Sequence, residues 1–215
     1  MLFNSIDFAL FLPIVFLLYW WVGGNSQRRR NVIVLVASYV FYGWWDWRFL
    51  GLIAFSTLLD YSLGVALGNT DDERKRKYLL WTSIAINLGF LGFFKYYNFF
   101  ADSFADAFTL FGSEFTTSRL NIILPVGISF YTFQTLSYSI DVYRGNLQPS
   151  RDPVAFAAFV SFFPQLVAGP IERASNLLSQ FLTPRTFDEA KAREGLRQML
   201  WGLFKKVVIA DYCAM

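Results

Sequence analysis

Long runs of apolar residues alternate with short polar loops along the chain. A run of about 20 apolar residues is long enough for an α-helix to cross the hydrocarbon layer of a membrane. The pattern predicts six such segments, at residues 6–22, 31–45, 49–67, 78–97, 120–143 and 154–170. The predicted fold class is therefore all-α, a polytopic helical membrane protein in which residues 1–215 form a single membrane domain.

The fifth segment carries a line of polar side chains within its apolar run. Residues three or four positions apart share one face of an α-helix, and the polar residues of this face are Tyr131, Gln134, Ser137, Tyr138 and Asp141. We call these five residues the polar stripe. Such a face is costly against lipid, so it must lie against protein or water. It is a candidate tunnel or cavity wall, and the alternative is a structural polar seam between helices.

Two further polar residues lie inside other predicted spans. Asp60 is in the middle of the third span, where a lone carboxylate costs about 2.5–3.5 kcal/mol unless it has a partner or water. It is interpreted as a cavity residue or, preferably, as an interhelical hydrogen bond that fixes packing. Gln165 follows Pro164 and precedes Gly169 and Pro170, which interrupt the sixth segment. Its amide can direct a donor and an acceptor into a cavity, and the alternative is a simple helix kink.

Basic residues gather in the loops that follow the first, third and fifth segments. These loops contain the clusters 28–30 and 74–77, and then Arg144 and Arg151. Because cytoplasmic loops carry an excess of Lys and Arg, all three are predicted to face the cytoplasm. A complete sixth crossing would put the basic residues of 173–197 on the opposite side. The sixth segment is therefore predicted to be a re-entrant or broken helix that returns to the cytoplasmic side.

Two amphipathic segments complete the predicted architecture. Thr186 and Glu189 have the spacing of a capping box, and the apolar residues of 196–207 repeat at helical spacing, with basic residues on another face. This pattern predicts a helix that lies at the lipid headgroups. Residues 99–111 predict a similar segment on the outer side.

Composition narrows the candidate chemistry. The chain is 55% hydrophobic and 20% aromatic with only 16% charged residues, and its net charge of +3 lies in loops, which does not indicate nucleic-acid binding. It has no histidine, and its one cysteine is Cys213. Neither a thiolate metal cluster nor an imidazole base is therefore available in this chain. Phosphate-binding loops and serine elbows are also absent. We predict no metal site and no catalytic residue within these 215 residues.

Four stretches resemble the membrane-bound O-acyltransferase family, and most of all its branch that acetylates bacterial exopolysaccharides. They are SYVFYGWWDWRFL at 38–50, STLLDYSLG at 56–64, LPVGISFYTFQTLSYSIDVYRG at 124–145 and FFPQLVAGPIERASNLLSQF at 162–181. The resemblance covers essentially the whole chain. It implies a multi-pass protein of the bacterial inner membrane, in contact with membrane lipid, with a tunnel through the fold.

The resemblance also implies a reaction. An acetyl donor, acetyl-CoA, enters from the cytoplasmic side, and the acetyl group passes to periplasmic partner proteins and through them to a polysaccharide such as alginate. Family members carry a catalytic histidine in their later half and are much longer, so this chain is predicted to be an N-terminal portion, truncated at Met215. Three alternatives stay open: a sister enzyme that transfers D-alanine to teichoic acids, a transporter or pore subunit, and a non-catalytic fragment.

Overall fold

A computed structural model describes residues 2–110 and 123–213 of the chain, and these residues form helices and no strand. The helices are α1 (Ile6–Leu17), α2 (Gln27–Asp46), α3 (Arg48–Gly68), α4 (Glu73–Leu91), α5 (Tyr97–Leu110), α6 (Ile128–Tyr143), α7 (Pro153–Val160), α8 (Phe163–Ala168), α9 (Ala174–Leu182), α10 (Glu189–Phe204) and α11 (Asp211–Cys213), with π-helical turns at η1 (Leu18–Val22), η2 (Gly92–Tyr96) and η3 (Lys205–Ala210). The all-α prediction is confirmed.

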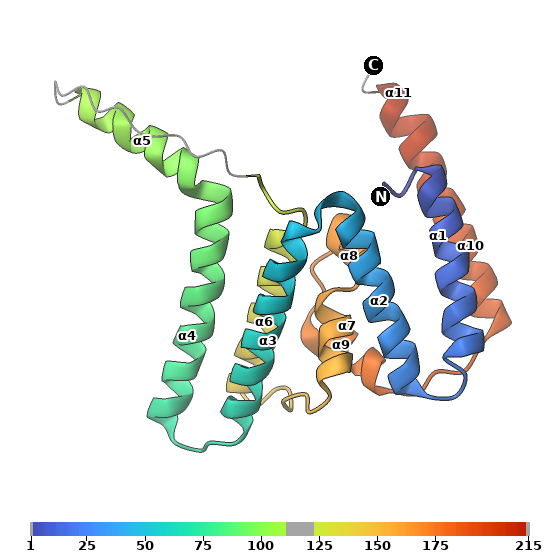
Figure 1. Ribbon diagram of the computed structural model, residues 1–215, viewed down its shortest axis with the longest axis horizontal. Helices are drawn as coiled ribbons and strands as arrows, with labels where there is room; N and C mark the ends of the chain where they lie inside the picture. The colour runs from blue at the N-terminus through green and yellow to red at the C-terminus, as the bar shows by residue number, and fades with distance from the viewer. Residues whose placement is uncertain (1, 111–122, 214–215) are drawn as a thin grey trace.

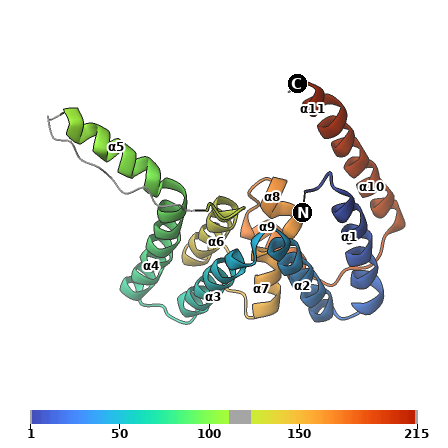
Figure 2. The same cartoon turned by 45° about the horizontal axis from the view of Figure 1, so that its top comes forward.

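The helices stand side by side and run mostly up and down the molecule (Figure 1). Helix α3 packs against α4, α6 and α7, and α2 packs against α3, α7 and α9. Helices α1 and α10 lie together at one edge, and the α4–α5 arm lies at the other edge, as a second view also shows (Figure 2). The centre of the bundle is therefore made by α2, α3, α6, α7 and α9, and the helices at its two edges are less covered.

A close helix–helix contact holds α3 against α6. A Cβ atom added at Gly64 of α3 would lie 2.5 Å from Cε1 of Tyr138 of α6, so only glycine leaves room for this ring. Tyr138 is fully buried, and its ring centroid is 4.6 Å from that of Phe156 in α7. The same ring therefore joins three helices, because it fills the space between α3, α6 and α7.

The three basic loops lie at one end of the bundle. Arg76, at the start of α4, donates through Nη1 to Leu67 O (2.5 Å) at the end of α3 and through Nη2 to Tyr143 O (2.8 Å) at the end of α6. Tyr61 of α3 donates to Arg151 O (3.0 Å) in the loop after α6. Because α2 and α3 run in opposite directions, the start of α2 with Arg30 lies at this same end (Figure 1). This arrangement agrees with the prediction that the loops share one side.

The sixth predicted segment is broken and returns, as predicted. Helix α7 ends at Val160, and α8 begins at Phe163 with Pro164 in its first turn, where proline is tolerated. The chain leaves α8 through Gly169, which is extended with φ −93°, and α9 then runs back toward the basic loops. Asn31 of α2 donates through Nδ2 to Phe181 O near the end of α9 (2.8 Å). The re-entrant segment is therefore anchored at the end of the bundle where it started.

The fifth predicted segment is shorter than expected. We predicted a helix over 120–143; positions 120–122 lie outside the described residues, and α6 begins only at Ile128. Pro125 has no backbone N–H, and Gly127 has φ 77°, a left-handed conformation that ends helical geometry and favours glycine. The 16 residues of α6 span about 24 Å, which is less than a hydrocarbon layer of about 30 Å. The whole polar stripe nevertheless lies within α6.

The two predicted amphipathic segments are helical, with different boundaries. Asp188 caps α10 and accepts from the backbone N–H groups of Ala190 and Lys191, so the predicted capping box from Thr186 does not form. Helix α10 continues without a break through η3 into α11 and runs beside α1 (Figure 1). Likewise, α5 continues from α4 through η2 and leans away from the bundle, and position 111 lies outside the described residues.

Candidate functional site

A buried polar cluster forms where α3, α4 and α6 meet, and Asp60 lies at its centre. Ser83 of α4 donates through its hydroxyl to Asp60 Oδ1 (2.6 Å). Asn87, one turn further along α4, donates through Nδ2 to Asp60 Oδ2 (2.8 Å) and Oδ1 (3.1 Å). Asp60 and Ser83 are fully buried, and Asn87 is almost so. Two side chains of α4 therefore hold the carboxylate of α3.

Helix α6 and a second residue of α3 extend this cluster. Ser139 of α6 donates to Asp60 Oδ1 (3.4 Å), and Thr135 Oγ1 lies 3.5 Å from Asn87 Oδ1. Ser56 of α3 donates to the same Asn87 oxygen (3.2 Å). We call these residues the Asp60 cluster: Ser56, Asp60, Ser83, Asn87, Thr135 and Ser139.

The Asp60 cluster contains no basic side chain, and the described residues hold no group of acidic, Cys and His side chains that could bind a metal ion. Neutral donors therefore surround the carboxylate. Buried polar groups that are satisfied in this way fix the relative positions of the helices that carry them. The packing interpretation of Asp60 is the one that this geometry favours, because the carboxylate bonds to both neighbouring helices.

The sequence pattern predicts Asp60 as a site residue but none of the side chains that bond to it. Each helix contributes two polar residues four positions apart: 56 and 60 in α3, 83 and 87 in α4, and 135 and 139 in α6. Residues at this spacing lie on one face of a helix. Three such pairs in three apolar segments are the signal that could have identified the cluster.

Three of the five residues of the polar stripe are buried in the protein, and the stripe makes different contacts from those of the Asp60 cluster. Tyr131, Gln134 and Tyr138 are buried, whereas Ser137 and Asp141 are partly exposed. Gln134 donates through Nε2 to Phe159 O of α7 (2.9 Å), and the Tyr138 hydroxyl accepts from the backbone N–H of Ser150 (3.0 Å). The stripe thus lies against α7 and the loop before it. Thr135 and Ser139, each one residue further along, face the Asp60 cluster instead.

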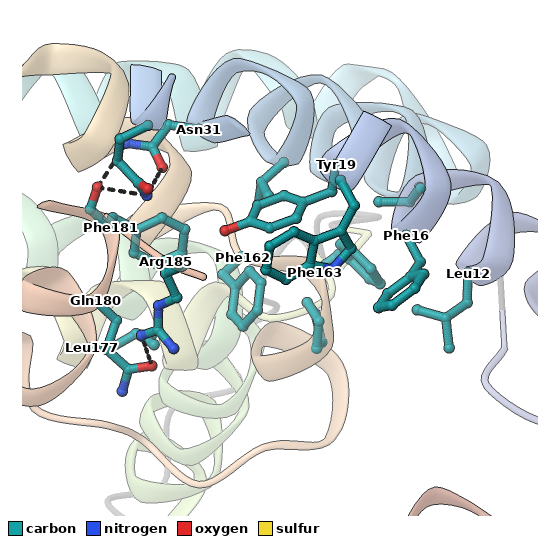
Figure 3. Close-up of a pocket in the computed structure, with 15 residues that line it drawn as sticks. Leu12, Phe16, Tyr19, Asn31, Phe162, Phe163, Leu177, Gln180, Phe181 and Arg185 are labelled. Atoms are coloured by element: carbon teal, nitrogen blue, oxygen red, sulfur yellow. Dashed lines mark hydrogen bonds between the residues drawn. The ribbon is translucent and has the colours of Figure 1, made fainter. Parts of the chain in front are cut away.

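A pocket lies elsewhere, between α1, α2 and the chain from α7 to α9. It has a volume of about 360 Å³. We call it the aromatic pocket, and its walls are Leu12, Val15, Phe16, Tyr19, Trp20, Gln27, Asn31, Val34, Phe162, Phe163, Pro164, Leu177, Gln180, Phe181 and Arg185 (Figure 3). None of the polar stripe residues, Asp60 or Gln165 belongs to these walls.

The lining of the aromatic pocket suits binding more than reaction. Its walls contain no carboxylate, thiol, amine or serine hydroxyl, and the phenol of Tyr19 is their one hydroxyl group. Gln165, predicted as a cavity residue, lies within α8 and bonds across the break that follows it: its Nε2 donates to Pro170 O (3.0 Å), and its Oε1 is buried with no hydrogen-bond partner among the described residues. The predicted residues are therefore distributed over the Asp60 cluster, the α6–α7 contact and the chain break.

Comparison with known proteins identifies relatives of the chain. It is 44% identical over 183 residues to the probable alginate O-acetylase AlgI of Pseudomonas putida, and this match covers 84% of the chain and 37% of that protein. Identity is 45% to the corresponding Azotobacter vinelandii protein, over 84% of the chain and 36% of the relative. A peptidoglycan O-acetyltransferase of Helicobacter pylori is 34% identical over 206 residues, 84% of the chain and 38% of the relative.

The chain therefore spans a little over a third of the length of these relatives. No family model and no solved structure matches it. Two of its described helical stretches, Arg48–Gly68 and Glu73–Phe104, are long and apolar enough to cross a membrane. Together with the relatives, these helices identify the chain as membrane-associated.

Proposed function

We propose that this chain, which belongs to the membrane-bound O-acyltransferase family, is the N-terminal part of an enzyme that O-acetylates an exopolysaccharide of the alginate type. The identity of 44% to an alginate O-acetylase, over 84% of the chain, is the observation that carries this proposal. We place the protein in the bacterial inner membrane as a multi-pass protein. We further propose acetyl-CoA as the donor and periplasmic proteins as the first acceptors.

The chain itself contributes position and not the reacting base. It has no histidine, the side chain that most often serves as a general base, and we propose that the chemistry of acetyl transfer depends on residues outside these 215. The Asp60 cluster supports this role because it bonds α3, α4 and α6 to one another. Gln134 supports it because it fixes α7 on α6. We propose that these contacts align the helices along which the acetyl group moves.

A chimeric enzyme tests the proposal. The matching segment of the Pseudomonas putida alginate O-acetylase is replaced by this chain, and the acetyl content of secreted alginate is measured by NMR. We expect the chimera to restore acetylation in a strain that lacks the enzyme. A chimera that reaches the membrane at the normal level and leaves alginate unacetylated would count against the proposal.

The same chimera tests the polar stripe. We expect Gln134→Leu to lower acetylation by about tenfold, because the carbonyl of Phe159 loses a buried donor and α7 shifts. Asp141→Asn is expected to lower it as well. Phe133→Leu, on the exposed face of the same helix, is the matched control and should have little effect. Normal acetylation in both stripe variants would remove the polar stripe from the mechanism.

The Helicobacter pylori relative favours a second candidate acceptor, a cell-wall glycan. Its identity of 34% is lower than the 44% to the alginate enzyme, so we rank this candidate second. The relatives described above are named neither as D-alanyl transferases nor as transporters. Placing the chain in the Helicobacter enzyme and measuring O-acetyl groups on peptidoglycan distinguishes the two acceptors.

A further inference from the structure

The aromatic pocket has an apolar end and a polar end. Leu12 and Phe16 of α1 lie at one end, and Asn31, Gln180 and Arg185 lie at the other (Figure 3). Leu12 and Trp20 are eight positions apart on α1 and η1, so the pocket follows that helix for about 12 Å. An elongated apolar space with a polar end matches the shape and chemistry of an amphiphile.

Aromatic contacts hold the first part of α1 against the bundle. The ring of Phe11 lies 5.3 Å from that of Phe163, and Phe8 lies 6.1 Å from Phe41. Further along α1, the side chains of Val15, Phe16 and Tyr19 border the pocket, whose walls also include Leu177 of α9. A space of this kind, between an edge helix and the bundle, is one that a lipid chain can enter from the side without displacing a packed core.

The polar end of the pocket is positively charged. Arg185 is the one charged residue among the lining residues. Its Nη2 donates to the neutral Gln180 Oε1 (2.7 Å), and no ion pair with a carboxylate is found for it in the described parts of the chain. Arg30 lies directly behind: it is buried, donates through Nη1 to Arg185 O, and stacks 4.6 Å from the Trp20 ring. Two guanidinium groups without a carboxylate partner attract an anion.

This charged end lies where lipid headgroups are expected. It is at the end of the bundle that holds the basic loops, close to the start of α2. Tyr19 and Trp20 border it, and these residue types are enriched at the membrane–water interface. Along the pocket, the apolar side chains of α1 come first, then the rings of Tyr19 and Trp20, and then the guanidinium of Arg185. The pocket therefore offers an apolar part to an acyl chain and a cation to a phosphate.

We propose that the aromatic pocket binds one anionic phospholipid. An acyl chain lies along α1 between Leu12 and Leu177, and the phosphate accepts hydrogen bonds from Arg185. The charge at the pocket mouth selects an anionic headgroup, because no carboxylate in the walls compensates it. This binding does not depend on the acetyl-transfer function.

Native mass spectrometry of the full-length protein tests the charge. The protein is released from micelles that contain equal amounts of phosphatidylglycerol and phosphatidylcholine with the same acyl chains. We expect one retained phosphatidylglycerol per protein. Arg185→Ala should weaken its retention by about tenfold, the usual size for a lost charge-assisted hydrogen bond. Arg193→Ala is the matched control, because Arg193 is exposed on α10 and pairs with Glu189. Equal retention of both lipids, or no effect of Arg185→Ala, would overturn the proposal.

A second pair of variants tests the space for the acyl chain. Val15→Trp fills the pocket from α1, and Leu177→Trp fills it from α9. We expect both to lose the bound lipid while circular dichroism stays unchanged, and Val207→Trp, on an exposed position of η3, to keep it. Soluble glycerol phosphate should not displace the lipid, because it lacks the acyl chain. Lipid retained by both filled variants would exclude this pocket.

A photo-crosslinker at Leu177 distinguishes lipid from protein as the occupant. The pocket borders the edge of the bundle, so a protein segment outside these 215 residues is the competing occupant. We expect crosslinks to phospholipid in membranes. Crosslinks confined to other parts of the protein would overturn the proposal.

Discussion

The α3–α4–α6 junction and the α1–α2–α9 junction differ in how side chains fill the space between the helices. At the α3–α4–α6 junction, Asp60, Asn87 and Ser139 bond across the interface and are almost fully buried. At the α1–α2–α9 junction, the walls are aromatic and a pocket of about 360 Å³ remains. The first is closed by specific hydrogen bonds, whereas the rings at the second leave a space between them.

The comparison indicates which helices move together. Short polar side chains allow α3, α4 and α6 to approach closely, and each hydrogen bond fixes one angle and one distance. At the other junction, the rings of Phe8 and Phe11 pack on Phe41 and Phe163, and such apolar contacts are less directional than hydrogen bonds. We therefore expect the α3–α4–α6 region to resist change as a unit, whereas α1 and α10 can adjust to a bound molecule.

The largest effect is expected at Asp60. Asp60→Ala removes the shared acceptor of Ser83 and Asn87, which keep only the Ser139 hydroxyl and the Ser83 carbonyl, and it leaves a cavity, so we expect the free energy of unfolding to fall by about 3 kcal/mol. Denaturant titration in mixed micelles measures this change. Asp71→Ala, in the exposed α3–α4 loop, is the control and should change little.

Asp60→Asn sharpens this result. The amide keeps one oxygen that accepts from Ser83, so the loss should be smaller than in Asp60→Ala. If both variants were as stable as the wild type, the Asp60 cluster would not hold the helices, and the contrast between the two junctions would fail.

Two adjacent leucines of α9 give the next largest effect. Leu178 is almost fully buried in the core, so Leu178→Ala should cost about 3 kcal/mol through lost contacts and a new cavity. Leu177 borders the aromatic pocket, where space already exists, and we expect Leu177→Ala to cost about 1 kcal/mol. Thermal unfolding of the two purified variants compares them directly. Equal losses would mean that the pocket is filled as tightly as the core.

The broken sixth segment shows what the sequence could predict. Pro164 and Gly169 marked the interruption, and the basic residues after it required a return to the same side. Both features are local in the sequence or depend on a simple charge rule. The structure confirms the break and the return, and it adds the anchor between Asn31 and Phe181. That anchor joins residues 150 positions apart, which no local pattern reveals.

The start of α6 and the partners of Asp60 show what the sequence pattern missed. Residues 120–127 are largely apolar, so hydropathy extended the predicted helix through Pro125 and Gly127, although both interrupt a helix. The partners of Asp60 are small polar residues that an apolar helix tolerates at little cost. Only the packing of three helices decides which of them meet the carboxylate. The helix face on which a residue lies could be predicted from the sequence, but the residue that it contacts on another helix could not.

The smallest effect on stability is expected at the start of α10. Lowering the pH weakens the Asp188 cap there and so measures how stable the first turn of this edge helix is. The pKa of Asp188 is lowered because its carboxylate accepts a hydrogen bond from the Lys191 backbone N–H. A lowered folded-state pKa stabilises the cap above the ordinary value of about 3.9, and this stabilisation is lost as pH falls through the lowered pKa. Hydrogen-exchange protection of the Lys191 amide should therefore decrease in acid.

Asp188→Asn should remove this pH dependence, whereas Asp72→Asn at the cap of α4 should preserve it. The first turn of α10 follows Phe187, whose ring lies 5.2 Å from Trp20 in the wall of the aromatic pocket. If acid lowered the hydrogen-exchange protection of this turn but not of the α3–α4–α6 region, the helices beside the aromatic pocket would be the ones that can adjust. Equal loss of protection in α4 and α10 would show instead that the two junctions unfold together, because a single cooperative unit loses all its protection at once.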